Sequence, residues 1–125
     1  MKLHAARLFV YDLAAAQAFY TEKLGLALVA GSAAMGYCVF DAGRTQLVIE
    51  AVQPDAPEED HALVGRFSGL SFSVTDIHTK YAELQALGVY FAGAPEQQAW
   101  GGALATFADP SDNQLQLVQV AHREA

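Results

Sequence analysis

The sequence repeats itself, and this internal duplication constrains the fold more than any other feature. Residues 10–13 read Val-Tyr-Asp-Leu and open a segment that closes with Leu-Gly-Leu at 24–26. Residues 74–77 read Val-Thr-Asp-Ile and open a matching segment that closes with Leu-Gly-Val at 87–89. The two segments have nearly the same length, which indicates that one structural unit occurs twice.

The ends of the two halves match as well. Residues 41–49 and 109–117 both begin with Asp and carry Gln-Leu at the same place, so the offset between them is constant. Two landmarks repeated in the same order support a duplication. We therefore expect one domain, residues 1–125, in which two modules are joined by a polar, exposed linker: 1–52, 67–121 and the linker 53–66.

Each copy has the pattern of one strand, one helix and three further strands. Alternation predicts the first strand, in which Leu8 and Val10 face one side while Arg7 faces the other. Asp12 and Asp76 are suited to accept backbone N–H groups at a helix start. In the first copy, a helix over 13–24 precedes strands at 27–31, 35–41 and 46–52. The second copy is expected to contain strand 70–75, helix 77–87, and strands 89–92, 104–108 and 114–120.

Two βαβββ modules predict an α+β fold, with curved, antiparallel-rich sheets around a cavity and helices on the outer face. Alternation places one set of residues against the helices: Leu8, Val10, Leu47, Ile49, Leu70, Phe72, Val74, Leu115 and Leu117. Their neighbours are expected to line the concave face: Arg7, Phe9, Gln46, Val48, Glu50, Gly69, Ser71, Ser73, Gln114 and Gln116. A mixed polar and apolar surface suits a small-molecule pocket.

Composition and charge disfavour several classes of function. The formal net charge of -7 argues against nucleic acid, because phosphate contacts need clustered Lys and Arg. No apolar stretch reaches the roughly 20 residues that span a bilayer. The amino terminus does not suit a signal peptide, so a cytoplasmic protein is expected. The single cysteine, Cys38, excludes an internal disulfide and is expected in the core.

Two motifs carry a resemblance to a known family. The Asp12 segment has Phe19-Tyr20 before Leu24-Gly25, and the turn 109–113 precedes the hydrophobic strand 114–120. Together they resemble the vicinal oxygen chelate superfamily, which includes glyoxalase I, bleomycin-resistance proteins and extradiol dioxygenases. The likeness covers essentially the whole chain. One departure is Asp112, where the family usually has glycine; Asp tolerates the left-handed backbone conformation, so the turn should survive.

The resemblance implies four cavity-facing positions at which the family's enzymes bind a metal ion, usually through His and Glu. Counted from Asp12 and Asp76, these positions fall on Ala5, Val48, Gly69 and Gln116. Alanine, valine and glycine side chains do not coordinate a divalent cation, and one neutral amide does not hold it alone. We therefore expect no metal ion, no cofactor and no catalytic residue at the family's usual site.

A displaced metal site is an alternative. His4 adjoins one ligand position and Glu50 shares a strand face with another, so a bulge would bring His4, Glu50 and Gln116 together. Strand parity argues against this arrangement, because it points His4 away from the cavity. The remaining histidines are expected to be solvated on the surface: His61, His78 and His122.

Seven residues are predicted to contact a ligand: Arg7, Tyr37, Gln46, Glu50, Ser71, Trp100 and Gln116. Arg7 either binds a carboxylate or phosphate of the ligand or pairs with Glu50 and stabilises the pocket. Trp100 lies in a loop beside glycines, and it either stacks on a planar ligand or packs at an interface.

The resemblance thus implies a metal-free, homodimeric binding protein of the bleomycin-resistance type, which holds a small organic molecule between its modules. The main alternative is an enzyme: a metal-dependent lyase, isomerase or dioxygenase with displaced ligands. A third hypothesis is a module whose groove binds a protein segment, and it predicts a large apolar patch on the surface.

Overall fold

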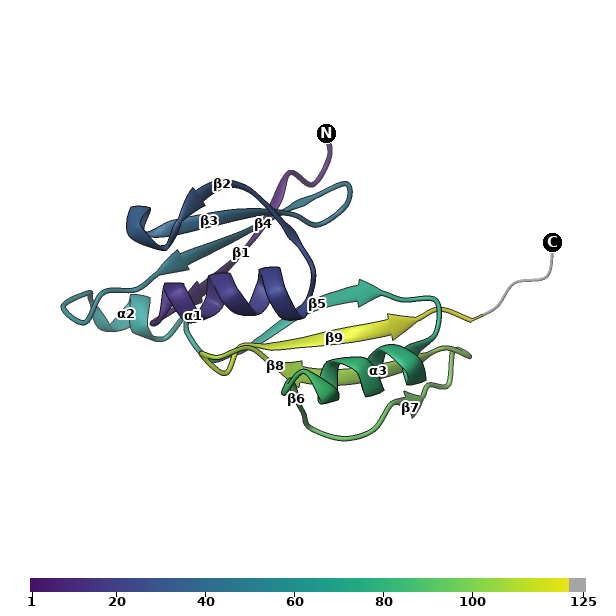
Figure 1. The fold of residues 1–125 in the computed structure, drawn as a ribbon. Coiled ribbons are helices and arrows are strands. Elements are labelled where there is room, and N and C mark those ends of the chain that lie inside the picture. Colours follow the sequence, from purple (N-terminus) through teal and green to yellow (C-terminus); the bar gives the residue numbers. More distant parts are fainter. Residues whose placement is uncertain (122–125) are drawn as a thin grey trace. The chain divides into compact units, whose positions relative to one another are not determined.

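The computed structural model describes residues 1–121, which form two compact units (Figure 1). Unit 1 comprises Met1–Arg66 together with the turn Pro110–Asn113. Unit 2 comprises Phe67–Asp109 and the chain from Gln114 onward. Each unit contains one sheet with its helices, so the predicted α+β architecture of two βαβββ modules is confirmed.

The sheet of unit 1 has four strands in the order β1-β4-β3-β2. Their bounds are Ala5–Val10 for β1, Ala27–Ser32 for β2, Tyr37–Asp41 for β3 and Gln46–Ala51 for β4. β1 runs parallel to β4, and the other pairs are antiparallel. The predicted turn at Gly43-Arg44 joins β3 to β4, and it is fixed by a hydrogen bond from the Gly43 N–H to the Asp41 carboxylate at 3.0 Å.

The first helix differs from its prediction in one respect. α1 (Leu13–Ala18) begins at Asp12, whose carboxylate accepts the N–H of Ala15 at 3.0 Å. From Phe19 the chain continues as a π-helical turn, η1 (Phe19–Lys23), instead of one regular helix to residue 24. The wider turn accommodates two neighbouring buried rings, since Phe19 and Tyr20 meet edge to face with centroids 5.1 Å apart.

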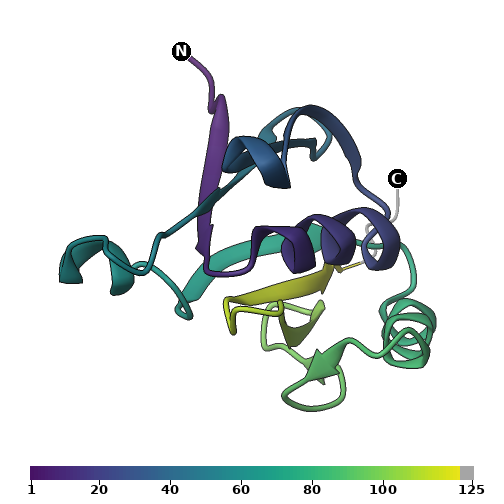
Figure 2. The same cartoon turned by 60° about the vertical axis from the view of Figure 1, so that its left-hand side comes forward.

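Two short helices complete unit 1. A 3-10 turn, η2 (Ala33–Met35), ends at Gly36 with a left-handed φ of 86°, so β3 begins two residues later than the predicted strand. α1 packs against η2 and β4. The linker contains the short helix α2 (Glu58–His61), and Figure 2 shows it as a loop that leaves the sheet of unit 1. No residue of the linker is fully buried, as its polar composition predicted.

Unit 2 contains a sheet in the order β5-β9-β8-β6, with β7 added beside β8. The bounds are Phe67–Ser73 for β5, Tyr90–Phe91 for β6, Glu96–Gln97 for β7, Ala103–Ala108 for β8 and Gln114–Gln119 for β9. α3 (Ile77–Ala86) begins at Asp76 as predicted and packs against β8 and β9. The two-residue strand β7 was not predicted, and β5 starts and ends earlier than the expected 70–75.

The core of each unit lies between its sheet and helix. Six of the predicted core residues are buried: Leu8, Val10, Leu47, Ile49, Leu115 and Leu117. The predicted burial of Leu70, Phe72 and Val74, in and just after β5, was too high, since all three are only half-buried. β5 is an edge strand and loses register with β9 between Phe67 and Ser71. Asp112 adopts a φ of 65°, which confirms the expected left-handed turn.

Candidate functional site

The sheet of unit 1 has one face turned away from its core, which we call the first open face. Successive strand residues alternate between the two faces. The residues of the open face are therefore those that alternate with the buried ones in the strand register. It carries the following side chains: Arg7, Phe9, Tyr37, Val39, Asp41, Gln46, Val48 and Glu50. Four of the seven predicted ligand contacts therefore lie on a single surface.

Arg7 and Glu50 form an ion pair on this face. The Arg7 Nε donates to the Glu50 carboxylate at 2.5 Å, and the two side chains are 60% and 29% exposed. The guanidinium also lies 5.2 Å from the centroid of the Phe9 ring. The hydrogen bond to Glu50 and its negative charge raise the pKa of Arg7. Of the two predicted roles of Arg7, the structure contains the pairing with Glu50.

This pairing also orients Arg7. Nε is the atom that bonds Glu50, and a guanidinium carries further donors on its two Nη atoms in the same plane. Tyr37 lies opposite Glu50 in the register of β3 and β4, and it remains partly exposed. Arg7, Tyr37 and Glu50 thus form a polar group beside the apolar Phe9, a combination that suits an organic molecule with hydrogen-bonding groups.

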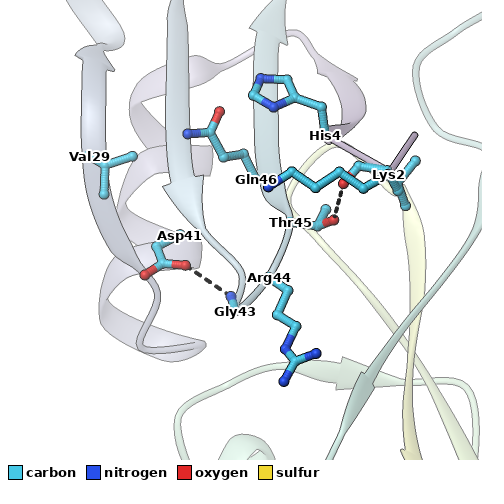
Figure 3. Close-up of a pocket in the computed structure, with 9 residues that line it drawn as sticks. Lys2, His4, Val29, Asp41, Gly43, Arg44, Thr45 and Gln46 are labelled. Atoms are coloured by element: carbon cyan, nitrogen blue, oxygen red, sulfur yellow. Dashed lines mark hydrogen bonds between the residues drawn. The ribbon is translucent and has the colours of Figure 1, made fainter.

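Gln46 lies at the other end of the first open face, in a hollow of about 400 Å³ that we call the amino-terminal hollow (Figure 3). The hollow is formed by the segment before β1, the β3–β4 turn and one residue of β2. Its lining residues are Lys2, Leu3, His4, Val29, Asp41, Gly43, Arg44, Thr45 and Gln46. Gln46 was predicted as a ligand contact, but its basic neighbours Lys2 and Arg44 were missed.

The open face of unit 2 carries Ser71, opposite Gln116 in the register of β5 and β9. The amide of Gln116 donates to the hydroxyl of Thr106 on β8 at 3.2 Å. Gln116 and Thr106 line a hollow of about 310 Å³ that also includes Glu96 and Gln98. Ser71 and Gln116 thus lie opposite each other, and the hollow that Gln116 lines carries amides, the Thr106 hydroxyl and the Glu96 carboxylate.

Trp100 lines a different hollow of unit 2, of about 810 Å³, which we call the Trp100 hollow. Ser73, Gln119 and Val120 contribute to it, and Trp100 is 53% exposed. The ring packs over Gly102, where an added Cβ would lie only 2.0 Å from a Trp100 ring carbon. Glycine thus lets the backbone approach the indole closely and leaves much of the ring open to a planar partner.

Comparison with known proteins identifies the family. Residues 2–117 match the model of the glyoxalase/bleomycin resistance protein/dioxygenase superfamily. The chain belongs to this superfamily. The resemblance inferred from the Asp12 and Asp109 motifs is therefore confirmed.

Individual relatives align over nearly their whole length. The uncharacterized protein YraH of Bacillus subtilis (strain 168) is 30% identical, with 96% of this chain and 99% of YraH covered. A superfamily member from Sphaerobacter thermophilus DSM 20745 is 29% identical with a TM-score of 0.80, over 95% and 97% of the two chains. TnmS3, an antibiotic binding protein from Streptomyces sp. CB03234, is 27% identical with a TM-score of 0.76, over 97% of both chains.

The metal-binding positions of the superfamily's enzymes do not fit a metal ion in this chain. By the spacing that the resemblance implies, they fall on Ala5 and Val48 in unit 1 and on Gly69 and Gln116 in unit 2. Gly69 lies where β5 loses register, with a φ of 73°, and Gln116 bonds Thr106. Within residues 1–121, no cluster of three His, Cys, Asp or Glu side chains is placed to hold a metal ion.

The strand register separates His4 from Glu50, the two residues on which the displaced metal site was built. The His4 carbonyl accepts the Gln46 N–H at 3.1 Å, whereas Glu50 pairs with Phe9 at the opposite end of the strand. At about 3.3 Å per residue, the two positions are roughly 16 Å apart along the sheet. His4 lines the amino-terminal hollow instead.

The other histidines and Cys38 differ in burial and contacts. His61 was expected to be solvated, but it is half-buried and its ring bonds the Tyr11 hydroxyl at 3.0 Å. His78 is exposed as predicted, and His122 lies outside the described residues. Cys38 is buried in the core as predicted, and burial raises the pKa of its thiol, which disfavours the thiolate form.

One absence concerns membranes: in the described part of the chain, residues 1–121, no helix is long and apolar enough to cross a bilayer.

Proposed function

We propose that this protein binds a small organic molecule on the open faces of its sheets, without a metal ion. The observation that carries the proposal is the Arg7–Glu50 pair beside Phe9, because it is a preassembled polar group on an otherwise mixed surface. Pre-organised polar groups next to apolar area are what orient a ligand in a binding site. The donor chemistry at the superfamily's metal positions supports the same proposal, since alanine, valine and glycine offer no ligand atom.

The proposed contacts are the seven predicted residues: Arg7, Tyr37, Gln46, Glu50, Ser71, Trp100 and Gln116. TnmS3, an antibiotic binding protein, is similar over nearly the full length of this chain and supports an organic ligand. A planar ring is favoured as part of that ligand, because Trp100 offers an exposed indole face. We further propose that the protein is a cytoplasmic homodimer.

A native mass spectrum tests the proposal most directly. The protein is purified without added metal, and the spectrum is repeated after addition of nickel, manganese, zinc or iron. We expect a dimer that takes up no stoichiometric metal, and organic mass retained from the cell would begin to identify the ligand. One tightly bound metal ion per subunit would overturn the metal-free assignment and favour the enzyme alternative.

A matched pair of variants then tests the site. Arg7→Ala should reduce retention of any co-purified organic molecule, whereas Arg66→Ala removes a similar charge from the linker and should leave retention unchanged. Loss in neither variant would remove Arg7 from the proposed contacts. The two proteins carry the same net charge, so a difference between them cannot come from overall electrostatics.

A further inference from the structure

The amino-terminal hollow has a charge opposite to that of the chain around it. The protein contains fourteen acidic and seven basic residues, yet Lys2 and Arg44 both line this hollow and Asp41 is its one carboxylate. Within residues 1–121 the ion pairs are Arg7–Glu50 and Lys80–Glu83, so Lys2 and Arg44 belong to neither. In an acidic protein, two basic side chains that gather without an internal partner create a local attraction for an external anion.

Asp41 offsets only one of the two basic side chains, and it also has a structural role. Its carboxylate accepts the N–H of Gly43 at 3.0 Å and closes the β3–β4 turn (Figure 3). The same turn presents Arg44 at the edge of the hollow. With one acid and two bases, the formal charge of the lining is positive even with a neutral His4.

The segment that carries Lys2 is held in place by two hydrogen bonds. The Thr45 hydroxyl donates to the Leu3 carbonyl at 3.0 Å, and the Gln46 N–H donates to the His4 carbonyl at 3.1 Å. In Figure 3 the Lys2 side chain extends across the strand toward Gln46, while the Arg44 guanidinium points away from both. Lys2 and the Gln46 amide therefore offer donors at the hollow, and Arg44 reaches it by rotation of its long side chain.

A β-bulge supplies an apolar wall. The register of β2 against β3 shifts between Leu28 and Ala30, so Val29 has no partner on β3. Val29 is 53% exposed and lines the hollow. Bulges interrupt the pairing of two strands locally, and they recur next to binding sites.

We propose that the amino-terminal hollow is a second binding site, which takes the carboxylate or phosphate group of a small organic anion. Lys2, Arg44 and the Gln46 amide bind the anionic oxygens, and Val29 contacts an aliphatic part of the ligand. A hollow of about 400 Å³ accommodates an anionic group together with a short carbon chain. This site shares Gln46 with the contacts proposed above, but it lies apart from the Arg7–Glu50 pair and does not rest on the function proposed above.

An NMR titration tests the site with defined probes. Inorganic phosphate, acetate and 3-methylbutanoate are added separately to 15N-labelled protein, with chloride used to hold the ionic strength constant. We expect saturable shifts of the Gly43 and Arg44 backbone amides and of the Gln46 side-chain amide. The 3-methylbutanoate arm should saturate at lower concentration than acetate if Val29 contacts the carbon chain, and phosphate saturating first would identify a phosphate site.

Variants distinguish this site from general attraction to positive charge. Each cation removed should weaken binding about threefold, and Lys2→Ala with Arg44→Ala about tenfold, as for solvent-exposed charge pairs. The control, Lys23→Ala with Lys80→Ala, changes the net charge equally and should bind as the unmodified protein does. Shifts that never saturate, or that are lost equally in both double variants, would overturn the site; the metal-free mass spectrum would be unaffected by that result.

Discussion

Leu47 and Ile49 of β4 occupy the same places in the repeat as Leu115 and Leu117 of β9, and all four side chains are buried. The residues between and beside them face the other way, and there Gln46 and Gln114 are identical whereas Glu50 corresponds to Val118. Val48 corresponds to Gln116 in the repeat. At these positions the two copies agree in the apolar character of the face that packs against a helix, and they agree less on the opposite face.

The open faces differ in kind as well as in sequence. The first carries full charges, in the Arg7–Glu50 pair and in the basic lining of the amino-terminal hollow. The second carries amides and hydroxyls, such as Gln116 bonded to Thr106. The two sets of groups favour different chemistry, because charged groups bind ionised partners and amides bind neutral donors and acceptors.

The largest expected effect tests the shared core. Ile49→Ala in unit 1 and Leu117→Ala in unit 2 should each lower the free energy of unfolding by about 2–5 kcal/mol, since each leaves a cavity behind a buried side chain. Val48→Ala, on the first open face, removes two methyl groups from a half-buried site and should cost about 1 kcal/mol or less. Urea denaturation measures all three. Similar losses for Ile49→Ala and Val48→Ala would contradict the division into core and open faces.

The turns before β4 and β9 offer a second comparison. Thr45 and Asn113 occupy the same place in the repeat, and each bonds a backbone group in unit 1. Asn113 is fully buried; it donates to the Phe9 carbonyl at 2.8 Å and accepts the Gly65 N–H at 3.0 Å. Thr45 is half-buried and donates to the Leu3 carbonyl.

Asn113→Ala should therefore cost about 1–3 kcal/mol, because it removes a buried amide and the hydrogen bonds it makes with the Phe9 carbonyl and the Gly65 N–H. Thr45→Ala should cost about 1 kcal/mol, since water reaches the groups that it releases. Thermal and urea unfolding of the two variants, side by side, gives the difference. Equal losses would show that the two turns serve their units in the same way, which their burial does not predict.

The sequence predicted what depends on periodicity. Alternation predicted the buried face of β4 and β9. Asp12 and Asp76 were recognised as helix caps because a carboxylate followed by an apolar helical repeat indicates a helix start from neighbouring residues alone. The amino-terminal hollow was missed because its lining comes from separate parts of the chain, including the segment before β1, the β3–β4 turn and Val29 of β2, which only the folded structure brings together. The π turn at Phe19 was missed for a similar reason, since burial of two adjacent rings is a tertiary effect.

In each unit, one glycine packs closely against an aromatic residue. An added Cβ at Gly31 would lie 2.3 Å from the Tyr37 carbonyl oxygen and 2.9 Å from its ring. At Gly102 it would lie 2.0 Å from the Trp100 ring and 2.4 Å from the Gln119 carbonyl oxygen. Gly31 also has a φ of 75°, whereas Gly102 does not have a left-handed backbone, so Gly102→Ala tests steric contact alone.

Gly102→Ala should displace Trp100 and lower the free energy of unfolding by about 1–3 kcal/mol, the usual cost of overpacking. The fluorescence of Trp100, the single tryptophan, should change at the same time. Gly93→Ala is the matched control, because space is open around it and its backbone is not left-handed. An unchanged emission spectrum in Gly102→Ala would show that the ring does not depend on this glycine.

The smallest effect concerns the two helix caps. Asp12 accepts one backbone N–H, from Ala15, whereas Asp76 accepts both the hydroxyl of Thr79 at 2.8 Å and its N–H at 3.2 Å. These bonds, with the hydroxyl first, lower the pKa of Asp76 below its ordinary value. The ionised cap therefore stabilises the folded chain above the unfolded-state value of about 3.9, and this contribution is lost as the pH falls through the lower folded-state pKa.

Thr79→Ala should raise the pKa of Asp76 toward its ordinary value, which an NMR titration of the side-chain carboxyl carbon measures directly. As the solution is acidified, the urea midpoint of the variant should then begin to fall at a higher pH than that of the unmodified protein. Ala15→Thr should give the first cap the missing hydroxyl and move the acid decline to lower pH. Gln85→Ala, near the end of α3, controls for a general change in helix stability. If the pKa of Asp76 is unchanged in Thr79→Ala, the Thr79 hydroxyl does not lower that pKa, and the proposed difference between the two caps is contradicted.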